Sequence, residues 1–262
     1  MPGRTAKRWP GAGEDSAGTV ALRLTQLAER PVMTAFDPLS APDASDVISR
    51  GTRVGTAASV LSMLFASTPE TGVLHNVANP EMLRLWPLRD DDSLEAARQL
   101  ATADESARQI RDEYLLVLGF GGPIPMTERA AGLAQRNACA DLDALYARHE
   151  FPTVMLRDVP LDHVGVEIAF AGHLATALAL AWRTREAAAC AQQAHSLGDF
   201  LDHHLGPLAA RVIHGIRTQC ATATYRAAAL LLTGMLKESV ALADFAVHAD
   251  PGQATSSETD IS

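Results

Sequence analysis

The sequence lacks any apolar run long enough to cross a bilayer, which takes about 18 residues or more. The apolar run at residues 227–232 is far too short for this. The N-terminus also lacks the apolar core and the cleavage site of a secretory signal, although Arg4, Lys7 and Arg8 are basic. We therefore expect a soluble protein of the cytoplasm.

Aromatic residues make up only 5% of the chain, and valine and isoleucine are sparse beside alanine and leucine. Small and unbranched side chains lose little rotamer freedom in a helix, so this balance favours helices over strands. We find no alternation typical of strands, no hairpin signal and no internal repeat. The sequence predicts an all-α, single-domain bundle of about 8–10 helices.

Cysteine is scarce. The three cysteines, Cys139, Cys190 and Cys220, are far apart and odd in number. In alanine-rich helical surroundings they are typical of small core residues in a reducing compartment. The net charge of −9 argues against nucleic acid as a partner. It suits a basic polypeptide, although it also serves simply to keep a protein soluble.

The motifs of several common active sites are missing as well. The sequence has no HExxH, no cysteine pair at zinc spacing, no GxSxG and no GxGxxG. His203 and His204 are adjacent, so on a helix they point roughly 100° apart and are poor joint metal ligands. We predict neither catalytic residues nor a metal site, and hence not an enzyme.

Both ends of the chain have the composition of tails. Residues 1–45 are rich in Gly, Pro, Ser, Asp and Thr, and residues 250–262 in Pro, Gly, Ser and Thr. Met33 is an alternative start. We predict disordered ends at 1–45 and 250–262 and a helical domain at 46–249.

Caps and breaks predict where the helices of this domain begin and end. Pro69 closes a first helix that begins near Val47, and Asp92 with Glu95 is a capping pair for a second. Further helices are expected at 107–118, from Thr127 to about His149, from Asp158 to about Trp182, and at 185–204, 207–219 and 222–248. We expect Gly206 and Pro207 to separate two of them.

Two segments interrupt the helices with unusual residues. The first, Phe-Gly-Gly-Pro-Ile-Pro at 120–125, follows the helix end at Tyr114. Such a loop lies at the surface, and we expect an exposed apolar edge around Phe120, Ile124 and Met126. A plain turn between helices explains the same residues.

The second segment gathers titratable residues around a proline, namely Asp158, Pro160, Asp162, His163 and Glu167. Asp158 suits the cap and Pro160 the first turn of a helix. His163 and Glu167 are four residues apart, so we expect them to touch on one helical face, where the carboxylate would raise the pKa of the imidazole. An ordinary capped helix start is the alternative interpretation.

In order and spacing, these segments resemble the TorD/DmsD/NarJ family of molybdoenzyme-specific maturation chaperones. The family pattern is Glu-Tyr with an aromatic residue and a Gly-Pro loop, then Pro-x-Asp-His with a later Glu, then Phe-Leu-x-x-His-Leu. The corresponding residues here are Glu113-Tyr114, Phe120 to Pro123, residues 160–163 with Glu167, and residues 200–205. The chain departs from the pattern in having Gly119 before Phe120, and in lacking the aromatic residues that often follow the first and third segments.

The resemblance implies a TorD-like helical fold and a cytoplasmic chaperone. Its partner would be the catalytic subunit of a molybdopterin oxidoreductase, whose twin-arginine leader or apo-form it would hold until cofactor insertion. The client-binding residues that the resemblance implies are Tyr114, Phe120, Gly122, Pro123, Asp158, Pro160, Asp162, His163, Glu167 and His204. The carboxylates among them suit arginine, and a groove between helices would take the apolar part of the leader.

We predict no cofactor, although the resemblance leaves guanine nucleotide or the molybdopterin cofactor open as ligands. We expect a monomer or a dimer that binds neither nucleic acid nor a membrane stably. Two other function classes stay open. One is a helical metal- or nucleotide-dependent hydrolase that uses Asp162, His163 and Glu167, and the other is an unrelated helical ligand-binding or interaction protein.

Overall fold

The computed structural model describes residues 44–69, 83–133, 138–153 and 159–248, and in them the chain is all-α, as predicted. The helices are α2 (Ala44–Ala66), α5 (Asp91–Ala101), α6 (Ala107–Glu113), α7 (Ala138–Arg148), α8 (Val164–Thr184), α9 (Ala187–Phe200), α10 (Gly206–Gln219) and α11 (Ala223–His248). Two π-helical segments, η2 (Tyr114–Leu118) and η4 (Leu201–Leu205), adjoin α6 and α9. The predicted disordered ends lie outside the described residues, so they stay predictions.

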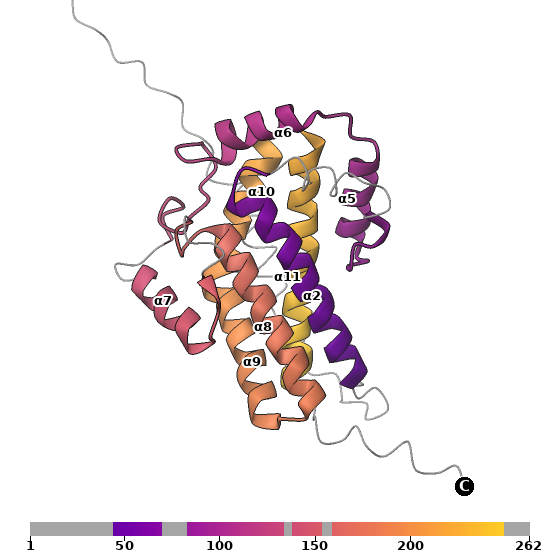
Figure 1. Ribbon diagram of the computed structural model, residues 1–262, viewed down its shortest axis with the longest axis vertical. Helices are drawn as coiled ribbons and strands as arrows, with labels where there is room; N and C mark the ends of the chain where they lie inside the picture. Colours follow the sequence, from indigo (N-terminus) through magenta and orange to yellow (C-terminus); the bar gives the residue numbers. More distant parts are fainter. Residues whose placement is uncertain (1–43, 70–82, 134–137, 154–158, 249–262) are drawn as a thin grey trace, which may run out of the picture. The chain divides into compact units, whose positions relative to one another are not determined.

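Helices α2 and α8 form the most extensive pair in the bundle, and Figure 1 shows them running side by side. Small residues let their backbones approach. A Cβ added at Gly172 would lie 2.4 Å from the Cβ of Ala58, and one added at Gly51 would lie 2.5 Å from the carbonyl oxygen of Ala175. The predicted apolar face of α2 is buried against this partner, from Val54 to Phe65. The close approach therefore follows from side-chain size.

Helix α8 is long and apolar enough to cross a membrane by length and composition. However, 72% of its most apolar window is buried inside the protein. A buried core helix of a globular protein has the same composition, and α8 packs on α2, α9 and η4. It is the one such helix among the described residues.

Helix α9 continues through η4 into α10 without leaving the helical conformation, because Leu201, Leu205 and Gly206 all have right-handed helical dihedrals. The prediction that Gly206 and Pro207 separate two helices was therefore wrong. Pro207 lies at the start of α10, directly after η4, and the chain stays helical around it. Helix α11 then returns along the bundle and packs on α2, α5, α9 and α10.

Three predicted helix starts were misplaced. Asp90, not Asp92, caps α5, because its carboxylate accepts hydrogen bonds from the backbone N–H and the hydroxyl of Ser93. Thr127 caps only a turn, accepting from the N–H of Ala130, and α7 begins at Ala138. The third start, that of α8, is described below with the site.

Two glutamates from the α5–α6 region cap α11 across the fold. Glu105 accepts hydrogen bonds from the N–H groups of Ala223 and Thr224, and Glu113 accepts from those of Ala221 and Thr222. A carboxylate is stabilised at a helix N-terminus, so these contacts tie α6 to α11.

The two cysteines whose side chains are described, Cys190 and Cys220, are buried and free, as expected of core residues. Burial raises the pKa of both thiols, that of Cys220 to about 12. Neither is therefore a thiolate at neutral pH.

Candidate functional site

The loop at residues 119–125 is only partly the apolar edge that the sequence predicts. Phe120 is fully exposed, next to a glycine, Gly121, with a φ of +80°. Ile124 and Met126 are buried, at 2% and 5% exposure, because the chain folds back and the N–H of Ile124 donates to the carbonyl of Val117. The expectation that Ile124 and Met126 are exposed was therefore wrong.

Two leucines that the sequence interpretation passed over extend the exposed apolar surface instead. Leu115 and Leu116, in η2, are 58% and 74% exposed. We name the side chains of Leu115, Leu116 and Phe120 the apolar surface. Its signal was present in the sequence: the buried stripe that includes Ile110, Tyr114 and Leu118 leaves both leucines on the opposite side of the helix.

The segment at the start of α8 meets the residues that directly follow the loop at 120–125. Thr127 and His163 form an isolated antiparallel bridge. The N–H of Val164 donates to the carbonyl of Met126 at 2.8 Å, and that of Glu128 to the carbonyl of Asp162 at 2.9 Å. Residues 126–129 thus pair with residues 162–164 at the start of α8.

His163 caps α8, so the helix begins at Val164 and not at Asp158. The Nδ1 of His163 accepts a hydrogen bond from the N–H of Gly165 at 3.1 Å, which places the proton of the neutral ring on Nε2. Burial lowers the pKa of His163 to about 4, although Asp162 opposes this shift. The predicted rise in its pKa was wrong, because desolvation outweighs the neighbouring charge. Asp158 lies outside the described residues.

Asp162 is 3% exposed, and its side chain accepts a hydrogen bond from the N–H of Arg129 at 3.2 Å. Pro160 is exposed, and its carbonyl accepts from the N–H of His163 in a turn. These contacts fix the segment before α8 to residues 127–129. The contacts of Asp162 and Pro160 therefore stabilise the fold, independently of any role of these residues in binding.

Glu167 lies in the first turn of α8 with no exposed surface. Neither carboxyl oxygen has a hydrogen-bond partner among the described residues, so the expected contact with His163 is not formed. Burial, followed by the charges of Glu128 and Asp162, raises the pKa of Glu167 well above 4.5. The group is therefore held in its neutral form far more readily than a carboxyl group in water.

Glu128 was not predicted as a site residue, yet it links residues 126–129 to η4. It is 4% exposed and its Oε1 lies 2.8 Å from the Nδ1 of His204. The His204 ring stacks on Phe200, with centroids 5.4 Å apart, and its side chain is 25% exposed. His204 therefore lies next to Glu128, through a contact that spans 76 residues and leaves no local signal in the sequence.

We name Glu128, Asp162 and Glu167 the acidic group. Among the described residues, no three histidine, cysteine or acidic side chains are placed to hold a metal ion. His163 and Glu167 are 8% and 0% exposed, so this arrangement does not offer them to a substrate as a hydrolase would require.

Tyr114 does not join this site. It is 6% exposed, its hydroxyl donates to the carbonyl of Phe65 at 3.3 Å, and its ring lies 6.3 Å from that of Tyr225. Burial raises its pKa. The structure therefore places Tyr114 in the core, while Gly122 and Pro123 stay in the loop near Phe120.

A family model described as the nitrate reductase delta subunit matches residues 126–214. This match confirms the resemblance to the TorD/DmsD/NarJ chaperones. That family matures molybdoenzymes, and its members are chaperones and not catalysts. The match contains the whole acidic group together with His163 and His204, whereas the apolar surface lies just before it. No curated protein and no solved structure matches the chain significantly.

Proposed function

We propose that this protein is a cytoplasmic chaperone for the catalytic subunit of a molybdopterin-containing oxidoreductase. It binds the twin-arginine leader of that subunit, the apo-subunit or both until the cofactor is inserted. The family match supports the general role, and the net charge of −9 suits a basic leader. The proposed chaperone role requires no catalytic residue.

The observation that carries the proposal is the apolar surface. Three large apolar side chains within six residues are 58%, 74% and 111% exposed, although 47% of the sequence is hydrophobic and the core has ample partners for such residues. Exposed apolar patches mark sites where another apolar segment binds. The apolar stretch of a leader is such a segment.

The arginines of the leader do not meet the acidic group in this arrangement. Asp162 and Glu167 are 3% and 0% exposed, so their predicted pairing with arginines would need residues 126–129 to move. Asp112 is exposed and lies one helical turn before Leu115 and Leu116, and within the described part of the chain its ion pair is with the neighbouring Arg108 at 3.5 Å. We infer that Asp112 takes a leader arginine as an exposed ion pair, which higher salt weakens.

Calorimetry with a synthetic leader peptide tests the surface. Replacing Leu116 and Phe120 together by alanine should weaken binding by roughly tenfold or more, because each large side chain contributes about 1.5 kcal/mol or more when it is buried. The matched control replaces Leu180 and Val247, which are 56% and 57% exposed on α8 and α11. Unchanged affinity in the first variant would locate docking elsewhere.

Co-purification tests the function itself. The tagged chaperone should retain the catalytic subunit of a molybdopterin oxidoreductase from the same cell, and more of it when the leader is present. A subunit that is retained neither with nor without its leader would contradict the proposed function. Retention that does not depend on the leader would restrict the proposal to the apo-subunit.

A further inference from the structure

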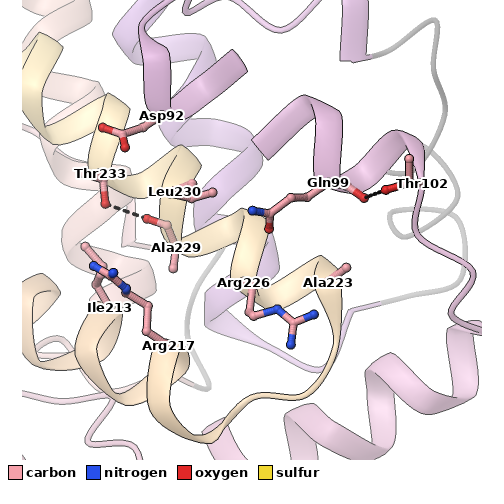
Figure 2. Close-up of a pocket in the computed structure, with 10 residues that line it drawn as sticks. All are labelled: Asp92, Gln99, Thr102, Ile213, Arg217, Ala223, Arg226, Ala229, Leu230 and Thr233. Carbon is pink, nitrogen blue, oxygen red and sulfur yellow. Dashed lines mark hydrogen bonds between the residues drawn. The ribbon is translucent and has the colours of Figure 1, made fainter. Parts of the chain in front are cut away.

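A second part of the molecule, away from the acidic group, has the features of a ligand site. A cavity of about 580 Å³ opens between α5, α10 and α11, within the size range of small-molecule sites. Figure 2 shows its lining, with Gln99 and Thr102 from α5 and its end on one side and residues of α10 and α11 on the other. None of the residues predicted from the sequence as client-binding lines it.

Two arginines line this cavity at corresponding positions of a helical hairpin. Helices α10 and α11 are joined by residues 220–222, with Arg217 in the helical turn before this connection and Arg226 in the turn after it. One turn further from the connection, Ile213 and Leu230 correspond in the same way and also line the cavity. The hairpin thus presents two cationic and two apolar side chains to the cavity.

The acids near this hairpin are committed to other partners. Asp92, which also lines the cavity, pairs with Lys237 at 2.5 Å. Glu105 and Glu113 accept hydrogen bonds at the N-terminus of α11. Across the residues that the structure describes, no hydrogen bond or salt bridge joins the guanidinium group of either arginine to another side chain or carbonyl. In a chain with a net charge of −9, two exposed guanidinium groups therefore line one cavity without a salt bridge to a described residue.

The hydroxyl groups at the cavity do not compete for the same role. Thr102 donates to the carbonyls of Arg98 and Gln99, and Thr233 donates to that of Ala229. The two guanidinium groups keep their donors for a ligand, and their planar forks match the oxygens of carboxylate and phosphate.

We propose that this cavity binds a small organic anion, whose phosphate or carboxylate group contacts Arg217 and Arg226 and whose apolar part lies against Ile213 and Leu230. The ligand is recognised by its charge and by its apolar body together. A neutral molecule of the same shape does not bind, and an inorganic anion binds less tightly than an organic one. The lining of this cavity shares no residue with the apolar surface, so the proposal can fail without affecting the proposed function, and the reverse.

Titration of the full-length protein with simple probes tests the site, with binding followed by calorimetry and by the shift in melting temperature. Phenyl phosphate and phenylacetate carry the two anionic groups on an apolar ring, inorganic phosphate lacks the ring, and benzyl alcohol lacks the charge. We expect saturable binding of at least one organic anion at about 1 mM or below. The preferred probe tells which oxyanion the site takes.

The double variant Arg217→Gln, Arg226→Gln should lose at least tenfold in affinity for that probe. Its matched control is Arg183→Gln, Arg211→Gln, which removes two exposed arginines that do not line the cavity and should leave affinity unchanged. Three outcomes would each overturn the proposal: no saturable binding of either organic anion, equal binding of benzyl alcohol, or equal losses in the two double variants. Melting temperatures without ligand check that both variants fold.

Discussion

Ionisation of the Glu167 carboxyl group is unfavourable in the folded protein, because its oxygens have no partner among the described residues and two other carboxyl groups lie nearby. Burial is the main cause of its raised pKa, and Glu128 and Asp162 add to it. In the unfolded chain the same group ionises near pH 4.5. The folded state therefore binds an extra proton above that pH, and its stability falls as the pH rises from 4.5 through the raised pKa.

The substitution Glu167→Gln keeps the shape of this side chain and removes its ionisation. We expect the variant to melt a few degrees above the wild type at pH 8, with a difference that shrinks as the pH is lowered towards about 4.5. The exposed Glu186 gives the matched control, since Glu186→Gln should show no such trend. Melting curves at a series of pH values measure this. A constant offset at all pH values would show that ionisation is not the cause.

Sequence reasoning located part of this site because part of it is local. The motif Pro-x-Asp-His predicts a helix start from neighbouring residues alone, and Asp162 and His163 do lie at the start of α8. The pairing of Glu128 with His204 depends on how distant helices pack, and the burial of Ile124 depends on the turn that precedes it. The sign of the pKa shift of His163 was missed for the same reason, since burial is a property of the fold.

At the scale of elements, the spacing of α2 and α8 is set by residues without room for another methyl group. The clearest contact is that of Gly172 with Ala58, where an added Cβ would lie 2.4 Å from an existing one. Alanine is otherwise favoured over glycine inside a helix by up to about 1 kcal/mol. For alanine at position 172, steric overlap with Ala58 and helix propensity therefore act in opposite directions, and the overlap is the larger effect.

We expect Gly172→Ala to lower the free energy of unfolding by roughly 1–3 kcal/mol. Adding Ala58→Gly should recover part of this loss, because it removes the atom that the new methyl group would meet. The control is Gly198→Ala in α9, whose added Cβ would have an ordinary 3.9 Å contact and which should be neutral or stabilising. Urea denaturation measures all three. Equal effects of the two alanine substitutions would contradict the close-packing argument.

Helix existence was predicted well and helix starts less well, for a physical reason. The apolar stripe of α2 and the α6–η2 stripe follow from periodicity alone. The first residue of a helix depends on which of several polar side chains accepts a hydrogen bond from an unpaired backbone N–H of the first turn. Asp90 and Asp92 both qualify by type, but Asp92 pairs with Lys237 on α11, which leaves Asp90 to cap α5.

At the scale of the whole molecule, the buried core draws on residues from Val47 to Ala246. Every described helix contributes to it. The first 32 residues precede all of them, and their composition offers little to bury. We expect a chain that starts at Met33 to melt within about 1–2 °C of the full-length protein. Differential scanning calorimetry of the two chains compares them, and a drop of several degrees would show that the extension is part of the fold.

The π-helical segment η4 also determines how the chain after it responds to a change in length. A π turn holds one residue more than an α turn, whereas an α-helix rotates by roughly 100° per residue. If one residue were deleted between Leu201 and Leu205, the chain could close as ordinary α-helix, and α10 would keep about the same rotational phase relative to α9. Leu208 and Val212, which are buried, would then still face the core. When related chains are aligned, a one-residue gap at this point is therefore compatible with the same packing of α10, whereas the same deletion inside α10 would turn the residues after it by roughly 100°.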